Sequence, residues 1–171
     1  MKTVAFSSWN GKIVDNRKGL AAKAAKADQK IPDQVAGKNI AALMGWNGLV
    51  VTDPKADIPS LAIAYLKEAR KLSCGECSVC MIGIDRVLDI LGGMSAGRGS
   101  KQDIQEIETV AKGVAANAKC NFGRAAALTP VLDAVKYFKA DFAAPAGKKA
   151  APEAGIYQSA VSAPCMQACP I

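Results

Sequence analysis

The sequence contains no histidine and few aromatic residues, since Phe, Trp and Tyr make up only 5% of its 171 residues. The absence of histidine excludes Ser-His-Asp and Cys-His nucleophilic sites, histidine-containing zinc sites and Rieske-type ligation. Any metal is therefore expected to be bound by sulfur or carboxylate. Few rings are available to stack on bases, and the net charge of +7 comes from scattered basic residues, so nucleic-acid binding is not expected.

Long hydrophobic runs are also missing. The apolar part of Met1–Trp9 is too short for a secretory signal, and no stretch approaches the roughly 18 apolar residues of a membrane span. We therefore expect a cytoplasmic protein without a membrane span. In that compartment, clustered cysteines are more often metal ligands or redox groups than structural disulfides.

Half of the residues are hydrophobic, and apolar residues recur at helical spacing along much of the chain. This pattern predicts a mainly α protein. A small mixed α/β segment is expected over 1–56, with a helix from Leu20 to Lys30. Two short strands are expected to follow the Asn-Gly turns at Asn10 and Asn47.

Residues 57–142 predict four helices with short connections, which is typical of an antiparallel four-helix bundle. Residues 143–171 begin with a linker rich in Ala, Pro, Gly and Lys and end in the start of a further cluster-binding region. The first helix is expected to start at Asp57–Ser60, and a second helix over Met81–Leu91 is expected to end in a polar loop over Met94–Gly99. An acidic capping box at Ser100–Asp103 is expected to start the third helix. The fourth helix is expected after Asn121–Gly123, with Pro130 in its first turn or at a local break.

Three of the six cysteines lie within the run "SCGECSVC", at Cys74, Cys77 and Cys80, and Cys120 follows 40 positions later. A cubane iron-sulfur cluster takes one thiolate at each of four iron corners, so three thiols from one loop and one distant thiol suit it. Structural zinc sites more often use two separated Cys-x-x-Cys pairs. The spacing favours a cluster over zinc, while buried structural cysteines and a redox-active Cys-x-x-Cys remain as alternatives.

"SCGECSVC", the Gly-Gly stop of the following helix and "AKCNFGRAAALTPVLDAVKYFKADF" resemble the iron-sulfur binding domain of the flavoprotein subunit of NADH:quinone oxidoreductase. The resemblance covers about residues 45–142. It implies that Cys74, Cys77, Cys80 and Cys120 ligate a [4Fe-4S] cluster. The Arg-x-Gly that usually follows the third cysteine in this family is here Met81-Ile82-Gly83.

The flavin- and nicotinamide-binding region of that family should precede the cluster domain, and the 73 residues before Cys74 are too few to contain it. Gly97–Ser100 lies between predicted helices, so it is not a dinucleotide-binding turn. The chain alone is therefore expected to bind neither flavin nor pyridine nucleotide. FAD and NADPH are expected only on a missing C-terminal region or on a partner.

Cys165 and Cys169 form a Cys-x-x-x-Cys-Pro ending that is similar to the cluster-binding entry of the family of glutamate synthase small subunits. They are candidates for a partial second metal site whose remaining thiolates come from beyond Ile171 or from a partner. The alternative is a flexible tail with two exposed thiols. A cluster module joined by a linker to such a segment resembles the β subunit of NADPH-dependent iron reductase.

These observations predict an electron-transfer module of an NAD(P)H-dependent oxidoreductase, relaying single electrons between flavin and other redox centres and not catalytic by itself. Its expected partner is a redox subunit or a C-terminal flavoprotein domain. Arg86 and Arg124 are candidates for positive charge near the cluster, with solvated ion pairs as the alternative. Two other classes stay open: a zinc-stabilised structural docking domain without a redox role, and a basic nucleic-acid adaptor.

Overall fold

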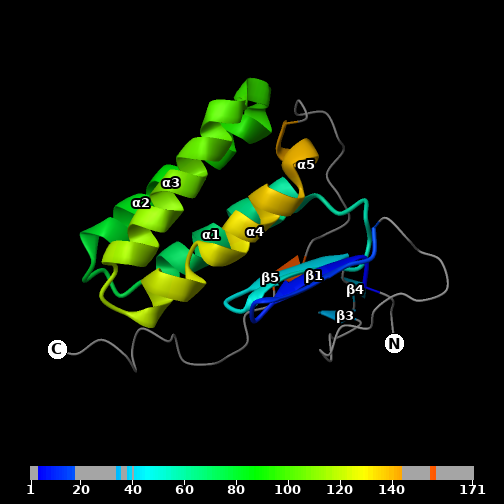
Figure 1. Ribbon diagram of the computed structural model, residues 1–171, viewed down its shortest axis with the longest axis horizontal. Helices are drawn as coiled ribbons and strands as arrows, with labels where there is room; N and C mark the ends of the chain where they lie inside the picture. Colours follow the sequence, from blue (N-terminus) through cyan, green and yellow to red (C-terminus); the bar gives the residue numbers. More distant parts are fainter. Residues whose placement is uncertain (1–3, 18–33, 36–37, 40, 144–154, 157–171) are drawn as a thin grey trace.

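In the computed structural model, the described residues are 4–17, 34–35, 38–39, 41–143 and 155–156. The predicted helix over Leu20–Lys30 and the cysteines Cys165 and Cys169 lie outside this part of the chain. The described elements form three layers, with a small sheet on one side, helices α1 and α4 on the sheet, and helices α2 and α3 beyond them (Figure 1).

The main sheet has the strand order β2-β1-β6-β5-β7. Its first four strands pair antiparallel, and β7 pairs with β5 in parallel. The strands of this sheet and of a separate two-stranded ribbon are β1 Phe6–Trp9, β2 Lys12–Asp15, β3 Gln34–Val35, β4 Lys38–Asn39, β5 Ala42–Gly45, β6 Gly48–Val51 and β7 Gly155–Ile156.

Both strands that the Asn-Gly signals predict are present, as β2 and β6. Asn10 and Gly11 form the first two-residue turn with φ angles of 51° and 76°, the conformation that hairpin turns favour. The second turn is shifted by one residue, because Gly45 pairs with Gly48 and leaves Trp46-Asn47 as the loop. Strands β1 and β5, the partners of these strands, were not predicted, because their short runs lack a clear alternation of polar and apolar residues.

The helical half of the molecule contains four longer helices, one short helix and two π-helical turns. Asp57 caps the first helix by accepting from the backbone N–H of Ser60, and Ser100 with Asp103 forms the predicted capping box. These elements are α1 Ile58–Leu72, α2 Ser78–Gly93, η1 Met94–Arg98, α3 Lys101–Asn117, η2 Phe122–Ala126, α4 Thr129–Tyr137 and α5 Lys139–Ala143.

Some helix limits differ from the prediction. Helix α2 begins at Ser78, before the expected Met81, and the expected loop after it is largely the π-helical turn η1. The turn after Cys120 is also π-helical, so α4 starts only at Thr129, with Pro130 in its first turn as predicted. A break at Phe138 then separates α4 from α5.

One apolar core joins the sheet to the helices. It extends from Phe6 on β1 through Leu66 and Ile107 to Phe142 on α5, and it includes three of the candidate ligand cysteines. Ser8 of β1 also donates a hydrogen bond of 2.5 Å to Asp133 of α4. The domain boundaries predicted at residues 56 and 142 stay predictions, although residues on both sides of 56 share this core.

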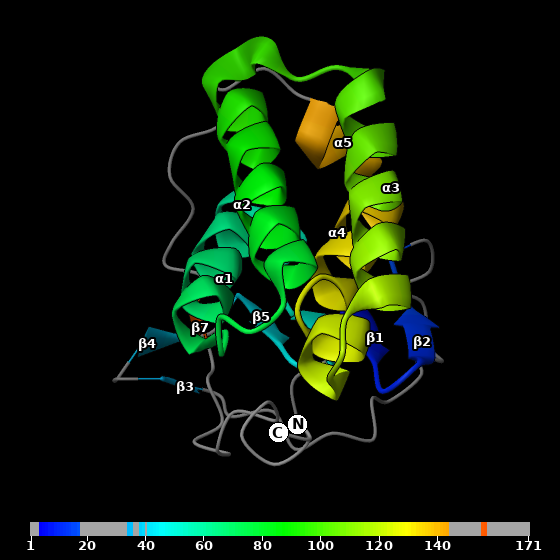
Figure 2. The same cartoon turned by 90° about the vertical axis from the view of Figure 1, so that its left-hand side faces the viewer.

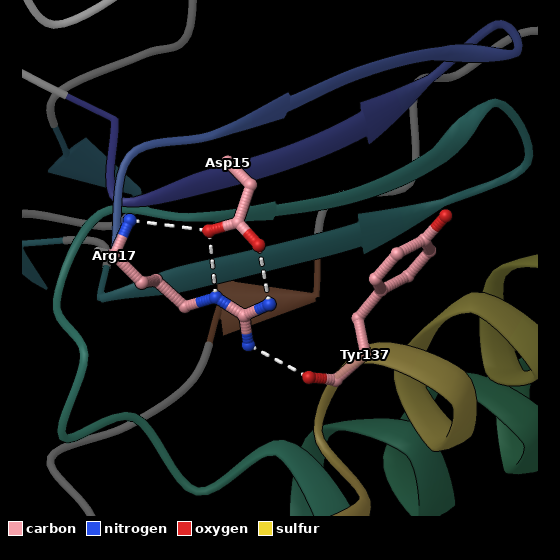
Figure 3. A network of polar contacts seen from close by, with 3 residues as sticks. All are labelled: Asp15, Arg17 and Tyr137. Carbon is pink, nitrogen blue, oxygen red and sulfur yellow. Dashed lines mark hydrogen bonds and ion pairs between the residues drawn. The ribbon is translucent and has the colours of Figure 1, made fainter. Parts of the chain in front are cut away.

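Arg17 links the end of β2 to the end of α4 (Figure 3). Its guanidinium donates two bonds to the carboxylate of Asp15, at 2.9 and 2.6 Å, and one to the backbone carbonyl of Tyr137 at 2.7 Å. The same group lies over the rings of Phe6 and Phe138, at 4.9 and 4.6 Å from their centroids. The hydrogen bond from Arg17 to Asp15 raises the pKa of Arg17, so the pair stays charged.

Candidate iron-sulfur site

The four ligand candidates in the described part of the chain come from elements that meet at one end of the molecule. Helix α1 ends and α2 begins there, and α3, which lies beside α2, ends there too (Figure 2). Cys74 and Cys77 lie in the connection between α1 and α2, Cys80 is in the first turn of α2, and Cys120 follows α3. The ends of these helices therefore bring the loop of Cys74 and Cys77 near the distant segment that contains Cys120.

Three of these thiols are buried and one is exposed. Cys77, Cys80 and Cys120 belong to the apolar core, whereas Cys74 is exposed to solvent, and none of the four forms a disulfide. Cys77 is the N-cap of α2, and its carbonyl accepts the backbone N–H groups of Cys80 and Met81. The positive end of the α2 dipole is thus directed at the site, which favours negative charge there.

Burial and neighbouring groups together set the pKa of the Cys80 thiol. Burial raises the pKa of Cys80 to about 11, a hydrogen bond with Ser73 lowers it, and the charges of Cys120, Cys77 and Cys74 raise it further. Cluster binding to this site therefore requires Cys80 to lose a proton, as thiolate ligation does in general.

The described residues contain no group of three or more Cys, Asp or Glu side chains placed to hold a metal ion. The turn after Cys120 packs beside Cys80, because a Cβ atom on Gly123 would lie 3.5 Å from the sulfur of Cys80. A cubane binds each thiolate at a different iron, so its ligands lie further apart than those of a single ion. A donor set of four thiols is chemically suited to iron-sulfur ligation.

Gly123 allows the turn after Cys120 to fold closely against the end of α3, beside Cys80. A Cβ atom at this position would lie 2.4 Å from the Cβ of Ala118 and 3.5 Å from the sulfur of Cys80. The first distance is shorter than real Cβ contacts allow, so an alanine here would displace the turn from Ala118, whereas the second distance is an ordinary contact. The glycine of the Cys-x-x-Gly turn is therefore required for the close packing of the site.

An aromatic cluster of Trp46, Tyr65 and Phe122 was not predicted from the sequence. The ring of Trp46, in the turn between β5 and β6, lies 5.0 Å from Phe122 and 5.6 Å from Tyr65. The buried hydroxyl of Tyr65 donates a hydrogen bond of 2.6 Å to the carbonyl of Ala126 in η2. In the sequence, the one sign of this cluster was Tyr65, a polar aromatic residue on the apolar face of the first predicted helix.

The two arginines proposed as sources of positive charge have different surroundings. Arg86 forms an exposed ion pair with Glu106 at 2.6 Å, which agrees with the alternative of a solvated pair. Arg124 donates through Nε to the carbonyl of Ala118 at 2.7 Å and therefore closes the turn that carries Cys120. Arg124 lies in the segment of the candidate site, whereas Arg86 ties α2 to α3 at the surface.

The surface near the loop of Cys74 is partly apolar. Leu72 at the end of α1 and Ile82 on α2 are two of the three large hydrophobic side chains that are exposed in the described part of the chain.

No helix among the described residues combines the length and apolar character that crossing a bilayer requires.

Sequence comparison places the four cysteines inside a match to a known family. Residues 60–145 match the family described as the NADH-ubiquinone oxidoreductase-F iron-sulfur binding region, which is half of the chain. The chain belongs to this family of iron-sulfur binding regions. The match includes Cys74, Cys77, Cys80 and Cys120, and it confirms the resemblance on which the sequence analysis relied.

Three relatives extend the match. The chain is 36% identical to the NADPH-Fe(3+) oxidoreductase subunit beta of Geobacter sulfurreducens, over 99% of this chain and 25% of that protein. It is 33% identical to the NADP(+)-dependent formate dehydrogenase subunit beta of Moorella thermoacetica, over 81% of this chain and 19% of the relative. Identity to an NADH-quinone oxidoreductase subunit of Rhizobium meliloti is 32%, over 60% of this chain and 24% of that protein. The chain thus spans a quarter or less of the length of these relatives.

Proposed function

We propose that this chain is an electron-transfer module that binds one [4Fe-4S] cluster through Cys74, Cys77, Cys80 and Cys120. The observation that carries the proposal is the packing of the turn after Cys120 beside Cys80, where a Cβ atom on Gly123 would lie 3.5 Å from the Cys80 sulfur. When bound, such a cluster accepts and releases one electron at a time. The helices supply a bundle that holds the four thiolates and limits access of water to three of them.

The thiol arrangement supports a cluster over the zinc-stabilised docking domain. A single zinc ion draws four ligands around one point, whereas a cubane separates them over four iron atoms. The candidate ligands are three closely spaced cysteines and one distant cysteine, whereas structural zinc sites more often use two separated Cys-x-x-Cys pairs. The membership in an iron-sulfur binding family supports the same choice.

The chain's place in a larger oxidoreductase is a proposal drawn from its relatives. Their names include a NADPH-Fe(3+) oxidoreductase and an NADH-quinone oxidoreductase, and the chain covers a quarter or less of each. We propose that FAD and NADPH bind to the remainder of a longer protein or to a partner subunit. In that arrangement, the module relays electrons between flavin and other redox centres.

Cys165 and Cys169 lie outside the described residues and stay a prediction. We propose that they belong to a second, separate cluster that needs further ligands from another segment or a partner. In this proposal the chain contains a mixed segment over 1–56, a helical cluster domain over 57–142, and a linker with the start of a further cluster-binding region over 143–171.

The decisive experiment is iron and acid-labile sulfide analysis of the chain purified without oxygen, combined with low-temperature EPR after reduction by dithionite. We expect iron and sulfide in equal amounts and an EPR signal that appears on reduction. A colourless protein containing one equivalent of zinc would contradict the proposal and support the docking domain. Steeply salt-dependent binding to DNA or RNA by a protein without a cluster would support the nucleic-acid adaptor.

A further inference from the structure

The four ligand candidates are covered unequally by the protein. The exposed fractions of Cys77, Cys80 and Cys120 are 6%, 4% and 4%, whereas Cys74 is exposed. The next two residues, Gly75 and Glu76, are exposed as well. Gly75 has a φ of +81°, a conformation that side chains disfavour, and this turn keeps the loop at the surface.

The other three thiols lie behind packed walls. Gly123 packs beside Cys80, because a Cβ atom on it would lie 3.5 Å from the sulfur of Cys80. Cys120 is followed by Phe122, whose fully buried ring lies 5.0 Å from that of Trp46, and the buried ring of Tyr65 lies 5.6 Å from Trp46. A reactant outside the protein is therefore held at least one packed layer away on these sides.

We infer that electrons enter and leave the cluster through the edge formed by Cys74, Gly75 and Glu76. The inference rests on the proposed function and adds the route of transfer to it. With a cluster held by the four cysteines, an outside reactant would meet the exposed Cys74 at this edge, whereas the other three cysteines are buried. In each transfer one electron passes between the cluster and the reactant, so one is oxidised and the other reduced, and no bond or proton need move.

Glu76 places one negative charge at this edge, which makes the route testable with small charged oxidants. A reactant that approaches the edge experiences the local charge, so its rate depends on residue 76. Glu76→Lys changes this charge from −1 to +1. Asp89→Lys makes the same change on the exposed face of α2, eleven residues after Ser78 and about 16 Å along the helix at 1.5 Å per residue.

The experiment uses the full chain with its cluster, reduced by dithionite, freed of excess reductant and mixed with one equivalent of oxidant in stopped flow. The oxidants are the anion hexacyanoferrate(III) and the cation hexaammineruthenium(III), at an ionic strength of about 0.1 M, where charges beyond about 10 Å are largely screened. We expect Glu76→Lys to raise the ratio of the anion's rate to the cation's rate by about fivefold or more. Asp89→Lys should change this ratio less than about twofold.

The inference is overturned if both variants change the ratio equally, or if Glu76→Lys leaves it unchanged while iron and sulfide contents match the parent protein. If Glu76→Lys loses its cluster, Glu76→Gln provides the test, and it should raise the ratio of the anion's rate to the cation's rate by a smaller factor. Failure of the proposed function is recognised earlier, because a parent chain without iron and sulfide gives no reduced cluster to oxidise.

Discussion

The hydroxyl of Tyr65 donates a buried hydrogen bond of 2.6 Å to the carbonyl of Ala126, across 61 positions of sequence. Tyr65 belongs to α1, which leads into the loop of Cys74, and Ala126 ends the π-helical turn that follows Cys120. The bond therefore connects the two segments that supply the ligands. Burial raises the pKa of Tyr65, so its hydroxyl keeps its proton and remains a donor.

Replacing Tyr65 with phenylalanine removes this donor and keeps the ring. The buried carbonyl then loses a partner, so we expect the free energy of unfolding to fall by about 1–3 kcal/mol. We also expect faster loss of iron to a chelator, because η2 is held less firmly beside Cys120. Chemical denaturation and the rate of loss of visible absorption measure the two effects.

Tyr137→Phe is the matched control, since Tyr137 is only partly buried and the variant keeps its ring contact with Phe6. The control should change stability by less than about 0.5 kcal/mol and leave the rate of iron loss unchanged. Equal iron loss from both variants would refute the role of the bond between Tyr65 and Ala126.

Gly123→Ala tests the close packing of the turn after Cys120 against Ala118. Its Cβ would lie 2.4 Å from that of Ala118, and neither group has a flexible side chain that can move away. We expect a loss of about 1–3 kcal/mol in stability and a lower iron content after identical reconstitution. Gly113→Ala on α3 meets nothing within 4 Å and should stabilise the helix by about 0.5–1 kcal/mol with unchanged iron content. Normal iron content in both variants would contradict the prediction.

The helices were predictable because their signals are local. The cap at Asp57, the capping box at Ser100 and Asp103, and the apolar spacing each depend on residues within one or two turns. The strands β1 and β5 were not found, because a four-residue strand shows too little periodicity and one partner of each lies far along the chain, with Phe6 opposite Val51 and Leu43 opposite Gly155. Pairing between distant strands depends on tertiary contacts that no local pattern records.

The candidate site was likewise predictable from the sequence only in part. Cysteine spacing identified the ligand candidates, since chemistry restricts which residues can bind a cluster at that spacing. The exposure of Cys74, the hydrogen bond from Tyr65 and the contact between Trp46 and Phe122 were not visible in the sequence. Each of these depends on how α1, the sheet and η2 pack together.

Arg17→Lys tests the link between the sheet and α4. Lysine keeps the charge but loses the planar fork that binds both oxygens of Asp15 while reaching the carbonyl of Tyr137. We expect a loss of about 1–3 kcal/mol in stability, measured by urea denaturation. Arg86→Lys, at the exposed pair with Glu106, should cost less than about 1 kcal/mol. Equal losses would show that the fork of Arg17 contributes no more than an ordinary surface ion pair.

Cys120→Ser tests whether the distant cysteine completes the cluster. A serine oxygen is a poor substitute for the fourth thiolate, so we expect the reconstituted variant to lose most of its [4Fe-4S] absorption and the EPR signal of the reduced state. Circular dichroism checks that the helices remain. The matched control is the double variant Cys165→Ser with Cys169→Ser, which removes thiols that the proposal assigns elsewhere. This control should keep the iron, sulfide and EPR signal of the first cluster, whereas their loss would mean that the terminal pair supplies ligands to the site at Cys74.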